Sequence, residues 1–172
     1  EREQSAREVL RSMVERRCFD VLREQEQLTY TIGVQANYNV QPAAHEDFSI
    51  HLSTASEHIA RVTAFVRQTL DEMQAQKFSA DAFKAAMIPL AVDEEAPQNP
   101  STDNPSLWMG LLNIYAETGE ELTPEESAKV APIFRTLTPQ DVAAVAKKVL
   151  STARQREIIV RPKPQQGKRT FK

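Results

Sequence analysis

The feature that most constrains the fold is a run of alternating apolar and polar residues between positions 28 and 40. Polar residues and Gly33 occupy the odd positions, and the even positions carry Leu28, Tyr30, Ile32, Val34, Ala36, Tyr38 and Val40. Successive side chains of a β-strand point to opposite faces of its sheet, so this pattern predicts a half-buried strand, bent near Gly33. The turn-rich segment 41–44 follows, and then a second strand with Phe48, Ile50 and Leu52 inward. The two strands are expected to form an antiparallel hairpin.

Helical patterns surround this hairpin. Apolar residues at the spacing of one helix face predict a helix over about residues 3–22. Thr54 and Glu57 have the form of a capping box, which predicts a helix with a buried stripe from Ile59 to Met73. Cap residues and helix stops predict further helices over residues 79–90, 106–118 and 123–134 and from Thr138 onward. A proline-broken loop is predicted over residues 93–105, and a short strand over residues 157–160.

This order of elements favours an α+β domain, with several helices packed on one face of an antiparallel sheet. Three strands make a thin sheet, so extra strands from an N-terminal portion are expected to complete it. The charged start, without Met or an apolar leader, is interpreted as a boundary within a longer protein. We expect residues 1–162 to be the C-terminal part of a larger domain and the basic segment 163–172 to be a disordered tail.

Composition excludes several classes of function. A net charge of −3 gives no general attraction to nucleic acid. No apolar run approaches the roughly 18–20 residues that would span a membrane. The single cysteine, Cys18, allows no intrachain disulfide and no thiolate metal cluster. Its place within a helical pattern favours a small buried hydrophobe over a catalytic thiol.

The three histidines are the remaining candidates for metal ligands: His45, His51 and His58. Glu57-His58 resembles the end of an HxxEH motif, in which two histidines on one helix turn bind zinc and the glutamate acts as general base. The position of the first histidine is occupied by Thr54, which cannot replace an imidazole. The sequence therefore predicts no metal site and no bound cofactor in this chain.

One segment carries a specific resemblance. Residues 21–34, with Leu22-Arg23-Glu24 at a helix end and Tyr30 opening a long strand, closely resemble a segment of the pitrilysin/insulinase (inverzincin) family of zinc metallopeptidases. Gln27 stands where the family usually has a glycine. The likeness continues in order through Phe48-Ser49-Ile50, Ser106-Leu107-Trp108 and Thr138-Pro139-Gln140-Asp141-Val142 to Ile158-Ile159-Val160-Arg161-Pro162.

The resemblance implies a non-catalytic half-domain of such an enzyme. In active members two homologous halves enclose a chamber, and the N-terminal half binds the zinc. The C-terminal half supplies an arginine and a tyrosine seven positions apart, which Arg23 and Tyr30 match as substrate-binding residues. By resemblance, Arg23 hydrogen-bonds a substrate carbonyl and Tyr30 stabilises the developing oxyanion. The implied partners are the catalytic half, in the same chain or another subunit, and a peptide substrate; the periplasm is favoured as the compartment by analogy only.

Other interpretations stay open at this stage. Tyr30 belongs to the apolar series of its strand and is equally compatible with the core. Arg23 is compatible with a solvated cation at a helix end. For the parent protein, the alternatives to a working peptidase are an inactive member that forms a chamber or an assembly, and a module that binds extended peptides along a strand edge.

Overall fold

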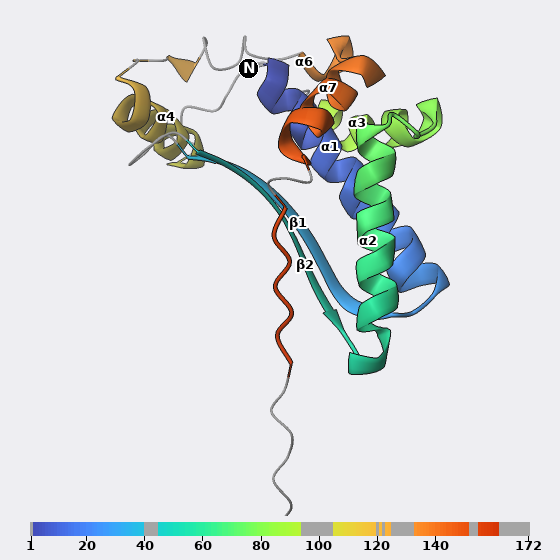
Figure 1. Ribbon diagram of the computed structural model, residues 1–172. Helices are drawn as coiled ribbons and strands as arrows, with labels where there is room; N and C mark the ends of the chain where they lie inside the picture. Colours follow the sequence, from blue (N-terminus) through green and yellow to red (C-terminus); the bar gives the residue numbers. More distant parts are fainter. Residues whose placement is uncertain are drawn as a thin grey trace, which may run out of the picture.

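A curved β-hairpin forms one layer of the structure, and helices form the other (Figure 1). The computed structural model describes residues 2–39, 45–93, 105–119, 121, 123–124, 133–151 and 155–161. The strands are β1 (Thr29–Asn39) and β2 (His45–Thr54). The helices are α1 (Arg2–Cys18), η1 (Phe19–Gln25), η2 (Ser56–His58), α2 (Ile59–Gln74), α3 (Ala80–Asp93), α4 (Pro105–Thr118), α6 (Ile133–Thr136) and α7 (Pro139–Val149).

The hairpin has the inward-facing residues that the alternation predicts from Ile32 onward. Ile32, Val34 and Ala36 lie opposite Leu52, Ile50 and Phe48 in an antiparallel ladder. Val34 belongs to the core, and its cross-strand neighbours pack against that core. The other face carries polar or small residues, including the pairs Gln35–Ser49 and Asn37–Asp47. One face of the hairpin is therefore apolar and covered, while the other is polar.

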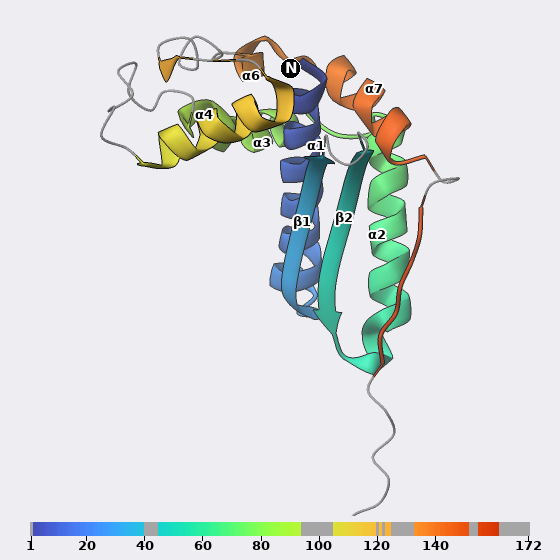
Figure 2. The same cartoon turned by 90° about the vertical axis from the view of Figure 1, so that its left-hand side faces the viewer.

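Helix α1 is the centre of the helical layer. It packs against β1, α2, α3 and α7, and Figure 2 shows α1 and α2 behind the hairpin. Its fully buried residues include Val9, Leu10, Val14 and Cys18. Burial of each such aliphatic side chain contributes about 1.5–3 kcal/mol relative to exposure, so this face holds the two layers together. The predicted α+β class, with helices on one face of an antiparallel sheet, is confirmed.

Most of the predicted helix boundaries agree with the structure. Ser79 Oγ accepts a hydrogen bond from the Ala82 amide at 3.0 Å and caps α3. Gly119 ends α4 with φ +73°, a value that glycine adopts without strain. Thr138 and Asp141 form a capping box at the start of α7. A hydrogen bond from Arg2, and then bonds from Thr138, lower the pKa of Asp141 to about 2.

Two local predictions are wrong. Thr54 and Glu57 form no capping box, because the Thr54 hydroxyl donates instead to the Leu28 carbonyl oxygen at 2.6 Å. The chain then makes the short 3-10 helix η2 before α2 begins. The predicted helix over 79–90 runs on to Asp93. Of the predicted helix over 123–134, residues 125–132 lie outside the described residues, as does the predicted basic tail.

The predicted strand over residues 157–160 is not part of a sheet. In the described part of the chain the sheet contains β1 and β2 alone. Residues 155–161 run as an extended segment (Figure 1), and Arg67 of α2 pairs with Glu157 at 2.6 Å. Ile158 and Val160 are 86% and 88% exposed. The local sequence favours an extended backbone, but a strand also needs hydrogen bonds to a neighbouring strand, and this segment pairs with neither β1 nor β2.

Candidate functional site

Arg23 lies on a π-helical turn that continues α1. The amide of Glu26 donates to the carbonyl oxygen of Val21 at 2.9 Å, five residues back, which is the hydrogen bond of a π-helix. Leu22 is fully buried in this turn, whereas the side chain of Arg23 is 49% exposed. The turn therefore anchors its apolar residue in the core and presents the next residue to solvent. Single π-turns within α-helices are frequent at functional sites.

The connection from Arg23 to Tyr30 depends on a left-handed residue. The Leu28 amide donates to the Leu22 carbonyl oxygen at 2.7 Å, which closes the chain sharply between the helix and β1. Gln27, within this connection, has φ +52°. A side chain at that φ is strained by about 1–2 kcal/mol, and glycine is not. The turn thus supplies a physical reason for the glycine usual in the resembled family at this position.

Gln27→Gly is accordingly expected to stabilise the chain by about 0.5–1 kcal/mol, because the relief of strain exceeds the entropy that glycine adds to the unfolded state. Thermal unfolding of the two proteins measures the difference. The matched control is Gln74→Gly at the end of α2, where the Gln74 amide donates to the Leu150 carbonyl oxygen. That change is expected to lower stability. A loss of stability in Gln27→Gly would contradict the strain.

A β-bulge turns Tyr30 away from the core. Thr29 pairs with Thr54 and Thr31 pairs with Ser53, so Tyr30 is the extra residue between two successive pairs. Its side chain is 77% exposed, although Ile32 and Val34, next in the same alternating series, pack inward. The core interpretation of Tyr30 is therefore wrong. Arg23 and Tyr30 both lie at the junction of η1 and β1, and both are accessible to a ligand.

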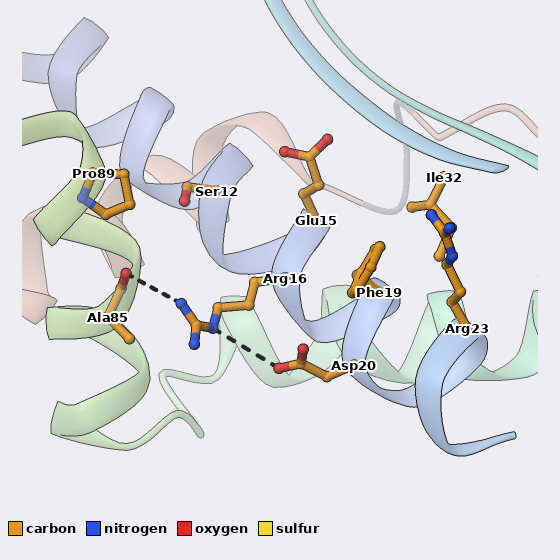
Figure 3. A pocket seen from close by; sticks show the side chains of 9 residues that line it. All are labelled: Ser12, Glu15, Arg16, Phe19, Asp20, Arg23, Ile32, Ala85 and Pro89. Carbon is orange, nitrogen blue, oxygen red and sulfur yellow. Dashed lines mark hydrogen bonds and ion pairs between the residues drawn. The ribbon is translucent and has the colours of Figure 1, made fainter. Parts of the chain in front are cut away.

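The surroundings of Arg23 leave much of its guanidinium accessible. Its carboxylate neighbour is Glu24, at 3.9 Å from Nε, which is too long for a hydrogen bond. Its guanidinium carbon lies 4.9 Å from the centre of the Phe19 ring. A groove of about 470 Å³ runs beside Arg23 between α1, β1 and α3, lined in part by Phe19, Asp20 and Ile32 (Figure 3).

Other candidate residues take no part in this site. Cys18 is fully buried, and burial raises the pKa of its thiol to about 11, which suits a structural residue. His51 is exposed on the polar face of β2, with Nε2 3.2 Å from Ser49 Oγ. Within the residues that the structure describes, no three His, Cys, Asp or Glu side chains gather as a metal ion would require. None of the helices described is long and apolar enough to cross a membrane.

Sequence reasoning identified Arg23 and Tyr30 but missed Phe19. The signal was present, because Phe19 and Arg23 are four positions apart near the end of a helix, a spacing that brings side chains together. It was hidden because Phe19 also fits the apolar periodicity of the helix predicted over residues 3–22. In the structure Phe19 is 37% exposed.

Comparison with known proteins identifies the family and the fold of this chain. A family model described as the peptidase M16 inactive domain matches residues 2–90, just over half of the chain. Among curated proteins, none matches the sequence. Solved structures share the fold. The periplasmic protease PqqL from Escherichia coli has a TM-score of 0.66 at 12% identity, over 87% of this chain and 16% of its own.

Two further structures are similar over comparable parts of the chain. A conserved protein from Enterococcus faecalis V583 has a TM-score of 0.64 at 13% identity, over 85% of this chain and 33% of its own. A predicted insulinase family protease from Yersinia pestis has a TM-score of 0.63 at 21% identity, over 88% of this chain and 32% of its own. The chain thus spans a third or less of each of these structures. It belongs to the M16 (pitrilysin/insulinase) peptidase family, as a C-terminal, non-catalytic half-domain.

Proposed function

We propose that this chain is the substrate-binding, non-catalytic portion of a zinc metalloendopeptidase that hydrolyses peptides or small proteins. Arg23 and Tyr30 act at a zinc site that lies in another half of the parent protein. The observation that carries this proposal is the exposure of both side chains at one junction, Arg23 by a π-turn and Tyr30 by a bulge.

The chemistry of the pair suits peptide hydrolysis. A zinc ion held by the other half would supply an activated water and a Lewis acid for the scissile carbonyl group. As negative charge grows on the carbonyl oxygen, the Tyr30 hydroxyl donates a hydrogen bond to it. The guanidinium of Arg23 binds a neighbouring backbone carbonyl through its planar N–H donors, which fixes the peptide in register. Donors held in place before the reaction stabilise this charge without reorganising.

The partner is therefore the zinc-binding half, either in the same chain or in a second subunit. The likeness to PqqL, a periplasmic protease, supports the periplasm as the compartment of the parent. The inactive-domain match supports a chain that binds no zinc itself.

The competing function is that of an inactive family member that forms a chamber or an assembly. A purely structural subunit has no need of a solvent-exposed Arg23 and Tyr30, so their presentation favours the peptidase. The two functions differ in the parent sequence. A peptidase carries HxxEH and a later glutamate in its N-terminal half, and an assembly subunit lacks them.

Separation and recombination of the two halves tests the proposal. The isolated chain is expected to hold no stoichiometric zinc and to cleave no peptide, because the zinc ligands lie in the other half. The isolated zinc-binding half is expected to hold the metal with little turnover, and mixing the two is expected to restore cleavage of a fluorogenic peptide. The chain with Arg23→Ala and Tyr30→Phe together serves as the control for simple stabilisation.

Metal analysis by mass spectrometry and initial rates provide the two readouts. One tightly held zinc per isolated chain would contradict the proposal that the zinc ligands lie in the other half. Restoration of full activity by the doubly substituted chain would assign this domain a structural role alone.

A further inference from the structure

The Phe19 ring is a half-exposed aromatic surface beside Arg23. We propose that Phe19 is a positioning residue, whose ring orients the Arg23 guanidinium beside the groove so that its N–H donors remain available to the substrate. This inference rests on the proposed function of Arg23. It adds to the site a residue that neither contacts the reacting atoms nor supplies a charge.

The first support is the geometry of the π-turn. Phe19 opens the turn and Arg23 lies four residues later, with its guanidinium carbon 4.9 Å from the ring centre. That distance is well within the roughly 6 Å range of a cation–π interaction. In Figure 3 the Phe19 ring lies next to the Arg23 side chain, which extends toward Ile32 of β1. The wider π-turn therefore brings a ring and a cation together at the mouth of the groove.

The second support is the difference between an aromatic ring and a carboxylate as partners of a guanidinium. The Phe19 ring attracts the guanidinium as a cation, at 4.9 Å from its centre, and offers no carboxylate oxygen to the five N–H donors. A carboxylate partner would occupy those donors. An aromatic partner restricts the side chain and leaves the donors free for a peptide carbonyl.

The third support is the state of the carboxylates that line the groove. Glu15 accepts a hydrogen bond from Arg11 at 2.8 Å. Asp20 lies 3.9 Å from Nε of Arg16, which in turn donates to the Ala85 carbonyl oxygen at 3.5 Å. Both carboxylates that line the groove are thus paired with other arginines, although Asp20 lies as far from Arg16 as Glu24 lies from Arg23. Together with the ring, these pairings favour an Arg23 that is oriented but not neutralised.

The test compares Phe19→Leu and Phe19→Trp in the full-length parent. Leucine keeps the apolar bulk but has no ring. The kcat/KM of the Phe19→Leu variant is therefore expected to fall about two- to fivefold, the range for losing an exposed cation–π contact. Tryptophan, the best cation–π partner, is expected to retain activity. The matched control is Phe65→Leu, because Arg17 lies 5.8 Å from the Phe65 ring on a different part of the structure. That variant is expected to keep the kcat/KM of the parent.

Two further measurements separate positioning from a structural effect. In an Arg23→Ala background, Phe19→Leu is expected to cause no additional loss, since its effect acts through Arg23. In the isolated chain, the side-chain protons of Arg23 are expected to show upfield ring-current shifts in proton NMR spectra, and Phe19→Leu is expected to remove them.

The outcomes distinguish this inference from the proposed function. If Arg23→Ala lowers kcat/KM but Phe19→Leu does not, the positioning role is overturned and the proposed function stands. A further fall in kcat/KM when Phe19→Leu is added to Arg23→Ala would also overturn the positioning role. So would the absence of upfield ring-current shifts on the Arg23 protons. If Arg23→Ala itself leaves kcat/KM unchanged, the proposed function fails and the positioning role fails with it.

Discussion

Arg23→Ala in the full-length parent is expected to lower kcat/KM by roughly 100-fold to 1000-fold, the usual cost of removing a donor that acts in the transition state. The effect on folding is expected to be small. Arg23 is about half exposed, its contact with Glu24 is 3.9 Å long, and its cation–π contact with Phe19 stabilises by about 1 kcal/mol or less. Peptide kinetics and thermal unfolding of the same samples measure the two effects.

Arg67→Ala provides a matched control for this result. Arg67 of α2 is also an exposed arginine, and it pairs with Glu157 at 2.6 Å. Its loss is expected to change kcat/KM by less than about twofold, since an exposed ion pair contributes little. Arg23→Lys adds a second comparison, because lysine keeps the charge but not the planar donors. If Arg23→Ala lowers Tm as much as the substitution of a core residue does, the fall in kcat/KM reflects a loss of folded protein, and the arginine is structural.

Tyr30→Phe is expected to lower kcat by a similar factor, roughly 100-fold to 1000-fold, through the loss of one hydroxyl group. The side chain is 77% exposed, so the hydroxyl makes no contribution to the core and Tm is expected to stay unchanged. KM is expected to change little, because the hydrogen bond to the oxygen strengthens as charge develops. The measurement is kcat and KM with a peptide substrate at saturation.

The control for Tyr30→Phe removes the same atom elsewhere. Tyr115 on α4 is 55% exposed, and Tyr115→Phe is expected to leave kcat at the level of the parent. An equal fall in kcat in the two variants would mean that Tyr30 has no special role. A rise in KM with unchanged kcat would assign Tyr30 to ground-state binding in place of oxyanion stabilisation.

Local sequence was sufficient where the interaction is short in range. The capping box of Thr138 and Asp141 and the Ser79 cap join residues three apart, so the structure of one turn decides them. The inward face of the hairpin was also predictable, since the period of two fixes which side chains share a face. Local sequence was misleading at Thr54, whose hydroxyl bonds a carbonyl oxygen 26 residues away.

The candidate site shows the same division. Arg23 and Tyr30 were found by type and spacing, as a resemblance to a known family. Their exposure was not predictable from periodicity, which gave Tyr30 a place in the core. A single extra residue in β1 reverses the direction of that side chain, and the bulge exists only because of the way β1 pairs with β2.

The sequence by itself determined the α+β class, the inward face of the hairpin, most helix ends and the identity of the motif pair, because each of these depends on the pattern of neighbouring residues. The tertiary structure decided two other features. It turned Tyr30 to solvent and left residues 157–160 without a place in the sheet. The physical reason is that bulges and strand pairing depend on contacts between segments far apart in the chain, and no local pattern encodes the partner.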